Sequence, residues 1–574
     1  MMLARASLPS SLFPSIVALV AAAAACGSPS GPDAGGAPDL GATPDAAMSD
    51  AGPDAAGPDA GRADLGTTDG GPVDAGPFDA GPRDLGSVDA GDAGGDEGLP
   101  DLGVPPTLIR VVHASPDAPL LDVRVQGSAS LLADDLAYGD ASAYGTAMPG
   151  PVTLEAVDAS TGGVVASEDV SLVEGTEVTV VVAGLFGSTA PADELRLLAL
   201  EEGFAAPGPA EAQVRVVHAG SDAPDVDIDV GLDGTAELTG LARFDASPAA
   251  GLGVDVGATP RLEVADGTDP VSTFTIDGLV AGDTVFVIAT GLVDRLPRQD
   301  DGFALLAVLP GDTTSSPTVW VRQDPRLHIL HLALDLDTSG GSSAEDMDIF
   351  LDDEELVAAA DFGTFAGPFQ RAPRTSGALD FFEAAPGPMR PAGSPDFTDG
   401  FGALTRGERY LLVAIGIGSS RTVPFEVVAM RPAIERDAGQ PTRPRVMALH
   451  GGPDANPMVR PFRADPPITD PSTDFTTLTV LDPLAYGVPS APAGVTLDET
   501  GQVVFGVGDG GSSTVDAWFA PFDFSGGFAR YLLIAGGAVD VINIVNGFPP
   551  VQLVVVEVTD DHEWIATTLP VVLP

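Results

Sequence analysis

The stretch Arg110-Val-Val-His-Ala-Ser-Pro-Asp-Ala-Pro119 opens a pattern that recurs along the chain. It returns as Arg215-Val-Val-His-Ala-Gly-Ser-Asp-Ala-Pro224, and looser versions begin near His331 and His450. In every version an aspartate follows the histidine by four residues, which gives the pairs His113 and Asp117, His218 and Asp222, His331 and Asp335, and His450 and Asp454. The histidines lie roughly 110 residues apart, which is long enough for a domain with its own core. The recurrence therefore predicts tandem domains.

Two more landmarks follow each histidine in the same order. A short box reads Leu136-Ala-Tyr-Gly139, Leu241-Ala-Arg-Phe244, Ala360-Asp-Phe-Gly363 and Leu484-Ala-Tyr-Gly487. A late apolar segment then occupies 175–184, 282–291, 407–416 and 528–537. Ordered landmarks that match in every copy indicate repeats of one structural unit.

The segments between turns have the period of β-strands. Asp122-Val-Arg-Val-Gln126 alternates polar with apolar residues, which places one strand face in a core and one in water. The 70 Gly and 53 Pro residues favour turns and strands over long helices. The predicted fold class is all-β, with four tandem Ig-like β-sandwich domains after a disordered N-terminal stalk. Because each repeat can form its own core, we expect independently folded units joined by linkers.

The expected boundaries follow these changes of composition. They are a lipoprotein signal peptide at 1–25, a disordered Gly/Pro/Ala/Asp-rich linker at 26–106, and β-sandwich repeats at 107–207 (repeat 1), 208–322 (repeat 2), 323–437 (repeat 3) and 438–574 (repeat 4). Low hydrophobicity and charge of one sign leave the linker unable to offset the entropy of ordering it.

The N-terminus predicts export and lipidation. Arg5 precedes an apolar run that ends in Ala23-Ala-Ala-Cys26, the order of a secretory signal. Cys26 resembles the lipidated cysteine of a bacterial lipobox, although Ala23 stands where leucine is usual. The alternative is simple secretion with an unmodified thiol. Cys26 is the only cysteine, so no intramolecular disulfide can form.

The charge restricts the partners. With 83 acidic and 26 basic residues the net charge is −57, and such a surface repels phosphates. We therefore expect no nucleic-acid binding. The expected contacts are the membrane, through the lipid anchor, and surface polysaccharide or protein.

The opening stretch, the Leu-Ala-Tyr-Gly box and the late Val-Val-Val-Ala-Gly segment resemble the domain of unknown function 4397. That family occurs in tandem in secreted or surface-anchored bacterial proteins, and the resemblance implies a β-sandwich-like fold but no activity. Repeat 3 departs from it with Leu332-Ala-Leu where Ala-Ser-Pro is expected. Repeat 4 has no recognisable alternating strand after Gly451-Gly-Pro-Asp-Ala455.

The His and Asp pairs are the first candidates for chemistry. A histidine and a carboxylate across a turn could act as base and orienting group, or could hold a metal. A serine nucleophile is available only as Ser115 in repeat 1. The simpler interpretation is that the histidine bonds the turn and the aspartate caps it, and we expect no catalytic residue and no cofactor.

Asp225, Asp227 and Asp229 are weak candidates for a calcium site. They alternate with Val226 and Ile228 on one strand, so a solvated strand face is the more economical interpretation.

The sequence therefore predicts a lipid-anchored cell-envelope or surface protein. Its expected role is structural, adhesive or binding, without catalysis, and its expected location is the bacterial envelope, as an outer-membrane lipoprotein facing the periplasm or the cell surface. The alternatives are a calcium- or glycan-binding module of an exported system and a cryptic hydrolase.

Overall fold

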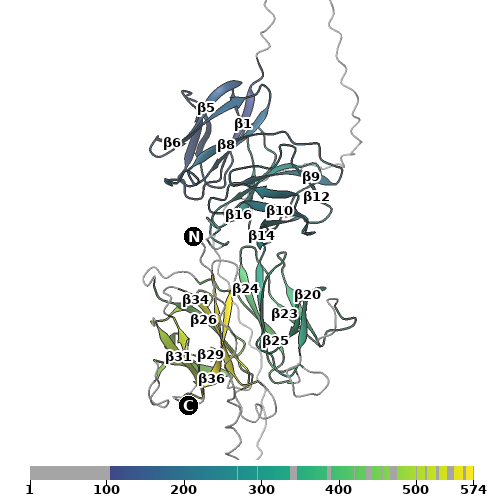
Figure 1. Ribbon diagram of the computed structural model, residues 1–574, viewed down its shortest axis with the longest axis vertical. Helices are drawn as coiled ribbons and strands as arrows, with labels where there is room; N and C mark the ends of the chain where they lie inside the picture. The colour runs from purple at the N-terminus through teal and green to yellow at the C-terminus, as the bar shows by residue number, and fades with distance from the viewer. Residues whose placement is uncertain are drawn as a thin grey trace, which may run out of the picture. The chain divides into compact units, whose positions relative to one another are not determined.

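The computed structural model describes residues 104–572, except 268, 294, 296, 337–345, 384–389, 419, 435–441, 454–456, 466–474, 482, 499–500, 511–513, 525–528, 539–548 and 560–563. The predicted signal peptide, Cys26 and all of the predicted linker before residue 104 lie outside these residues. The described part of the chain contains β-strands and one short 3-10 turn, Thr479–Leu481, and no α-helix. It accordingly holds no helix that could span a membrane. The prediction of tandem all-β domains is confirmed as a fold class (Figure 1).

Repeat 1 forms two four-stranded sheets. One has the order β4 (Gly145–Ala147), β1 (Thr107–His113), β7 (Glu177–Ala183) and β8 (Arg196–Glu201). The other has the order β3 (Leu131–Leu136), β2 (Leu121–Val125), β5 (Gly150–Asp158) and β6 (Val164–Leu172). The inward faces of both sheets share one apolar core, which makes the repeat a sandwich.

Repeat 2 has the same plan with one added strand. Its first sheet runs β12 (Leu252–Asp255), β9 (Glu211–His218), β15 (Thr284–Thr290), β16 (Ala304–Val308) and β17 (Thr318–Val321). Its second sheet runs β11 (Leu238–Leu241), β10 (Val226–Val230), β13 (Arg261–Asp266) and β14 (Asp269–Thr275).

Repeat 3 returns to two four-stranded sheets. The first runs β21 (Phe365–Gln370), β18 (Arg326–His331), β24 (Arg409–Ile415) and β25 (Glu426–Met430). The second runs β20 (Glu354–Ala360), β19 (Met347–Leu351), β22 (Gly377–Glu383) and β23 (Phe397–Phe401).

Repeat 4 differs because its strands form one continuous sheet. The order is β28 (Thr476–Thr477), β27 (Met458–Ala464), β31 (Gln502–Asp509), β32 (Ala517–Phe519), β36 (Ile565–Val572), β35 (Gln552–Glu557), β34 (Arg530–Gly536), β26 (Arg445–Gly451) and β30 (Val495–Thr496), with β29 (Leu484–Ala485) beside β27 and β33 (Phe522–Asp523) beside β31. Strand β36 pairs with both β35 and β32 and so joins what are separate sheets in the other repeats. Strand β27 occupies the position where the sequence showed no recognisable strand.

The opening stretch forms an interior strand of its sheet in every repeat. In repeat 1, β1 pairs in parallel with the late strand β7 and antiparallel with β4. The parallel pairing recurs between β9 and β15, β18 and β24, and β26 and β34. Such a strand is covered on both faces, which explains its run of apolar residues in place of alternation.

The outer face of the β1 sheet packs against the matching sheet of repeat 2. Val111 points into the core of repeat 1, whereas its neighbour Val112 belongs to a second cluster that contains residues of both repeats. The members of that cluster from repeat 2 include Phe286, Ile288 and Leu306, all fully buried. Repeats 1 and 2 therefore share an apolar interface.

Repeats 3 and 4 are paired through the same sheets. Leu330, Leu411 and Val413 of repeat 3 form one buried cluster with residues of repeat 4 that include Leu532 and Ile534. Each repeat also has its own inner core, so independent folding of the units stays a prediction, but these neighbours are joined by packing as well as by linkers. The sequence did not reveal this packing because an apolar outer face has the same sequence signature as a second inward face.

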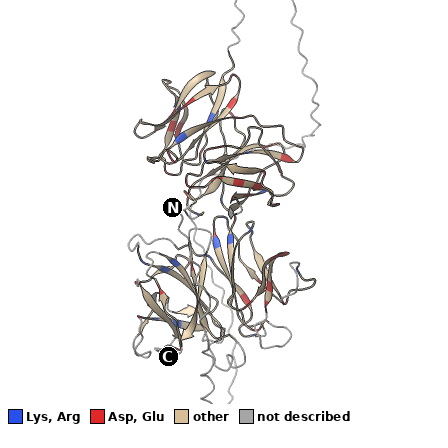
Figure 2. Cartoon of the chain, viewed as in Figure 1, with Lys and Arg blue, Asp and Glu red and all other residues tan. Residues whose placement is uncertain are grey.

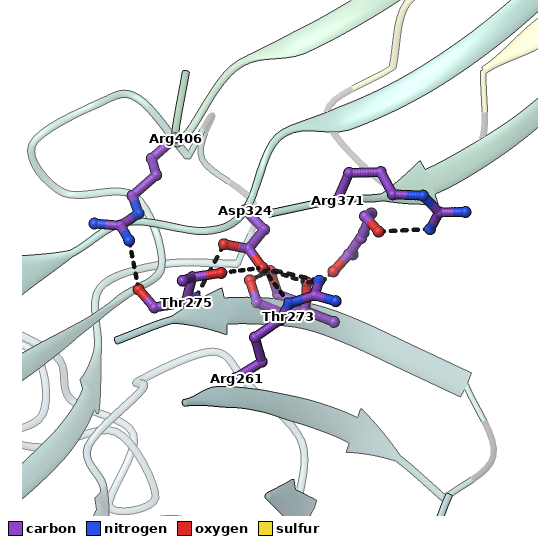
Figure 3. A network of polar contacts seen from close by, with 8 residues as sticks. Arg261, Thr273, Thr275, Asp324, Arg371 and Arg406 are labelled. Carbon is purple, nitrogen blue, oxygen red and sulfur yellow. Dashed lines mark hydrogen bonds and ion pairs between the residues drawn. The ribbon is translucent and has the colours of Figure 1, made fainter. Parts of the chain in front are cut away.

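A polar network joins repeat 2 to repeat 3 (Figure 3). Asp324 lies in the connection between β17 and β18, and its side chain is completely buried. Its carboxylate accepts hydrogen bonds from the hydroxyls of Thr273 and Thr275 and pairs with Arg261 at 3.0 Å. Gln370 of repeat 3 accepts the backbone N–H of Thr273 on edge strand β14.

Candidate functional site

The signature histidines bond the turn that follows their own strand. His113 Nε2 lies 3.1 Å from the carbonyl oxygen of Pro119, and His218 Nε2 lies 2.8 Å from that of Pro224. The backbone N–H of Ser115 donates to His113 Nδ1, which requires a neutral ring protonated on Nε2. Burial lowers the pKa of His113 and His218 and favours this neutral form.

The histidines of repeats 3 and 4 occupy the same strand position. His331 is buried, and burial lowers its pKa to about 4. His450 is also buried, and its Nδ1 accepts the backbone N–H of Gly452 at 3.4 Å, as His113 does from Ser115. The rings of His113, His218 and His450 thus contact the backbone of the turn that follows their strand, and all four signature histidines are buried.

The signature aspartates have other partners. Asp117 Oδ1 accepts the backbone N–H of Phe186 at 2.8 Å, and Asp222 Oδ1 accepts that of Val293 at 2.8 Å. Phe186 follows the late strand β7, and Val293 follows the late strand β15. Each carboxylate therefore connects the turn after the opening strand to the loop after the late strand of the same repeat. Asp335 adopts a positive φ of 51°. Asp454 lies outside the described residues.

The short box that follows each histidine in the sequence forms a hydrogen bond to the backbone of that histidine. The last residue of each box donates its N–H to the carbonyl of the signature histidine, at 2.7–2.9 Å, from Gly139, Phe244, Gly363 and Gly487. All these residues have positive φ, a conformation that glycine adopts at little cost. The landmarks of the repeat are thus parts of one local hydrogen-bonding arrangement.

The weak calcium candidates of repeat 2 are engaged with the backbone. Asp227 Oδ1 accepts the N–H of Gly240 at 2.6 Å, and Asp229 Oδ2 accepts that of Gly234 at 2.8 Å. Asp229 is buried, whereas Asp225 is exposed and precedes the strand. The structure does not bring these residues together as a metal-ligating group among the described residues.

Asp227 belongs to a feature that the sequence analysis missed. The matching residues Asp122 and Asp348 also cap a left-handed residue on the next strand, accepting the N–H of Asp135 and of Ala359 at 2.9 Å. The strand registers shift at each of these points, as at a β-bulge. Aligning the second strands of the repeats would have revealed the recurring aspartate.

Repeat 1 places two further carboxylates at this bulge. Asp122, Asp134 and Asp135 each present a carboxylate oxygen within 4.8 Å of the others. Asp134 and Asp135 also line an open groove of about 570 Å³. Its other polar lining residues are Asp140, Ser142 and Tyr144 of repeat 1 and Ser316 and Thr318 of repeat 2. This acidic groove is the candidate binding site of the molecule.

The charge distribution is consistent with an acidic exterior. Figure 2 marks Asp and Glu positions in red and basic positions in blue along the strands of the sandwiches. Two arginines form ion pairs with acidic side chains of the chain itself. Arg110 is buried and lies 3.1 Å from Glu202, and Arg261 pairs with Asp324 in the connection between repeats 2 and 3.

Comparisons with known proteins identify a family for one part of the chain. Residues 107–229 match the family described as "Domain of unknown function (DUF4397)", a span that covers repeat 1 and the first strands of repeat 2. No curated protein matches the chain.

The solved structures with detectable likeness include one from Bacteroides uniformis and one from Bacillus anthracis. One is a Bacteroides uniformis protein whose description assigns it provisionally to cell adhesion, with 12% identity, a TM-score of 0.13, and coverage of 39% of this chain and 98% of that chain. The other is the Bacillus anthracis TIE protein, with 7% identity, a TM-score of 0.12, and coverage of 72% of this chain and 65% of that chain. TM-scores this low carry no functional argument.

Proposed function

We propose that this chain is a non-catalytic scaffold of the bacterial cell envelope that holds its β-sandwich repeats away from the membrane to bind surface polysaccharide or protein. The observation that carries the proposal is the use of the signature residues. His113 and Asp117 bond backbone groups of their own repeat, and His218 and Asp222 do the same. Groups engaged in this way maintain the fold and are not free for catalysis.

The paired packing of the repeats supports the same role. Apolar sheet faces pack repeat 1 against repeat 2 and repeat 3 against repeat 4. Repeated binding surfaces on one chain raise the effective affinity for a polymeric or multivalent partner. An acidic exterior keeps such a protein from associating with itself.

The proposed anchor is a lipid on Cys26 after removal of residues 1–25, which places the protein as an outer-membrane lipoprotein facing the periplasm or the surface. The sequence before Cys26 supports this placement, and the acidic linker would serve as a tether.

The test compares cells that carry the parent chain, the Cys26→Ser variant, or no chain. We expect only the parent chain to be labelled with fatty acid and retained by the cells. We also expect surface labelling of its repeats, and stronger attachment of the cells that carry it to polysaccharide-coated and protein-coated surfaces. A chain with His113→Gln should support attachment as well as the parent if it is equally stable. Equal attachment by cells with and without the chain would overturn the proposal.

A further inference from the structure

The connection between repeats 2 and 3 brings together a threonine hydroxyl, a carboxylate and a carboxamide. Thr273 Oγ1 donates a hydrogen bond to Asp324 Oδ2 at 3.1 Å (Figure 3). The backbone N–H of the same threonine donates to Oε1 of Gln370, which belongs to repeat 3. Because one residue makes both hydrogen bonds, its hydroxyl lies next to the carboxamide. A nucleophile, a base and an acyl group in contact are the groups that an acyl transfer requires.

Backbone hydrogen bonds hold these groups in place from both repeats. The N–H of Asp324 donates to the carbonyl oxygen of Thr273 at 2.8 Å. On the other side, the N–H of Arg371, the residue after Gln370, donates to the carbonyl oxygen of Pro325 at 3.1 Å. The connection is thus bonded to β14 of repeat 2 and to the end of β21 of repeat 3. Groups positioned by the backbone in this way react as parts of one chain, without the entropic cost of an encounter.

The charges around Thr273 favour attack by its hydroxyl. The side chain of Asp324 is completely buried and accepts the hydroxyl proton. Arg261 Nη2 donates to Thr273 Oγ1 at 3.3 Å and stabilises the negative charge that develops there. The backbone N–H of Thr273 is bonded to Oε1 of Gln370, the oxygen that becomes negative when the carboxamide is attacked. Thr273 is only 4% exposed, so water has little access to compete as nucleophile.

A second hydroxyl near Asp324 does not have the same surroundings. Thr275 Oγ1 also donates to Asp324 Oδ2, at 3.0 Å. Its backbone N–H, however, donates to Asp324 Oδ1, whereas that of Thr273 donates to Gln370. Of these two threonines, Thr273 is therefore the one whose N–H would stabilise the oxyanion formed on the carboxamide.

We propose that Thr273 and Gln370 form an ester bond that joins repeat 2 to repeat 3. Oγ1 of Thr273 attacks Cδ of Gln370 while Asp324 takes the hydroxyl proton. The tetrahedral intermediate then loses the carboxamide nitrogen, which leaves as ammonia with the proton that Asp324 returns. One C–O bond replaces one C–N bond, and no further reactant is needed. The reaction occurs once per chain, without turnover, and it does not depend on what the repeats bind.

The test is peptide mass spectrometry of the full chain after denaturation and cleavage at arginine. Thr273 lies in the peptide 262–295, and Gln370 lies in the peptide 327–371. We expect these peptides to be joined, with a mass lower than their sum by one ammonia, and fragment ions should place the bond at the two named residues. Hydroxylamine, which cleaves esters, should separate them. Separate peptides of unmodified mass in the parent chain overturn the proposal.

Variants of the same chain identify the reacting groups. Thr273→Val lacks the nucleophile and Gln370→Glu presents a carboxylate that resists attack, so each should abolish the joined peptide, whereas Thr273→Ser should retain it. Asp324→Asn should form the ester about 100-fold more slowly, because the base is lost. The matched control is Thr314→Val, which removes a threonine hydroxyl that donates to Asp312 at 2.5 Å and should leave the joined peptide at the parent amount. A joined peptide that persists in Thr273→Val would overturn the assignment.

Discussion

Arg110 Nη1 donates a hydrogen bond to the carbonyl oxygen of Leu309 at 3.0 Å, across the boundary between repeats 1 and 2. The relationship is reciprocal, because Arg215 at the matching position of repeat 2 donates to the carbonyl of Glu201 in repeat 1. Both guanidinium groups lie 5.5 Å from the ring of Phe286. The signature arginine therefore belongs to the interface between repeats, and the two repeats are related as a pseudo-two-fold pair.

Arg110→Met should strongly destabilise this pair. The change leaves Glu202, 7% exposed, without its cation, and breaking a buried ion pair from one side costs about 3–5 kcal/mol. Adding Glu202→Gln should recover part of the loss, since no buried charge then remains. Urea unfolding measures both values. Arg295→Ala, in an exposed pair with Asp301, should change stability by less than about 1 kcal/mol, and an equal loss there would contradict the assignment.

Gly139→Ala should weaken the contact between repeats 1 and 2. An added Cβ would lie 2.5 Å from the Trp320 side chain, and φ is +88°. Gly127→Ala is the control because φ is +78° there and nothing lies within 4 Å. Both changes should cost about 1–2 kcal/mol for the left-handed backbone, and Gly139→Ala should cost more through the clash. Hydrogen exchange in β16 and β17 should increase only for Gly139→Ala; equal exchange in both variants would place Trp320 away from Gly139.

The free energy of unfolding should depend on His331 in mild acid. Burial lowers its pKa to about 4 in the folded protein, whereas the unfolded chain has about 6.5. Between these values the unfolded state binds more protons, so stability falls as pH decreases from about 6.5 to about 4, by up to about 1.4 kcal/mol per pH unit. His331→Gln lacks this contribution. Urea midpoints at several pH values should show a steeper fall for the parent; identical slopes would mean that His331 is protonated while folded.

Asp324→Asn should loosen the connection between repeats 2 and 3. The substitution keeps the shape of the side chain but removes the charge opposite Arg261, and we expect a loss of about 3 kcal/mol. Amide exchange in 322–325 should rise. Asp277→Asn is the control, because Asp277 pairs with Arg406 while 65% exposed, and it should change stability by less than about 1 kcal/mol. An Asp324→Asn protein with unchanged exchange would show that the threonines alone hold the connection.

The sequence by itself determined the strands and the repeat. Alternation in Asp122-Val-Arg-Val and the ordered landmarks predict β-sandwich units because strand period and turn chemistry are local properties. The interpretation of His113 as a turn-bonding residue followed from the same local logic, and its bond to Pro119 spans only six residues.

Only the tertiary structure decided what covers the second face of each of these interior strands. Val111 and Val112 are alike in sequence, yet the first enters the core of repeat 1 and the second contacts repeat 2, because strand neighbours point to opposite faces. The meeting of Asp122, Asp134 and Asp135 was equally hidden. It depends on a positive φ at Asp135, a non-glycine residue, and on the pairing of β2 with β3, neither of which can be read from the residues alone.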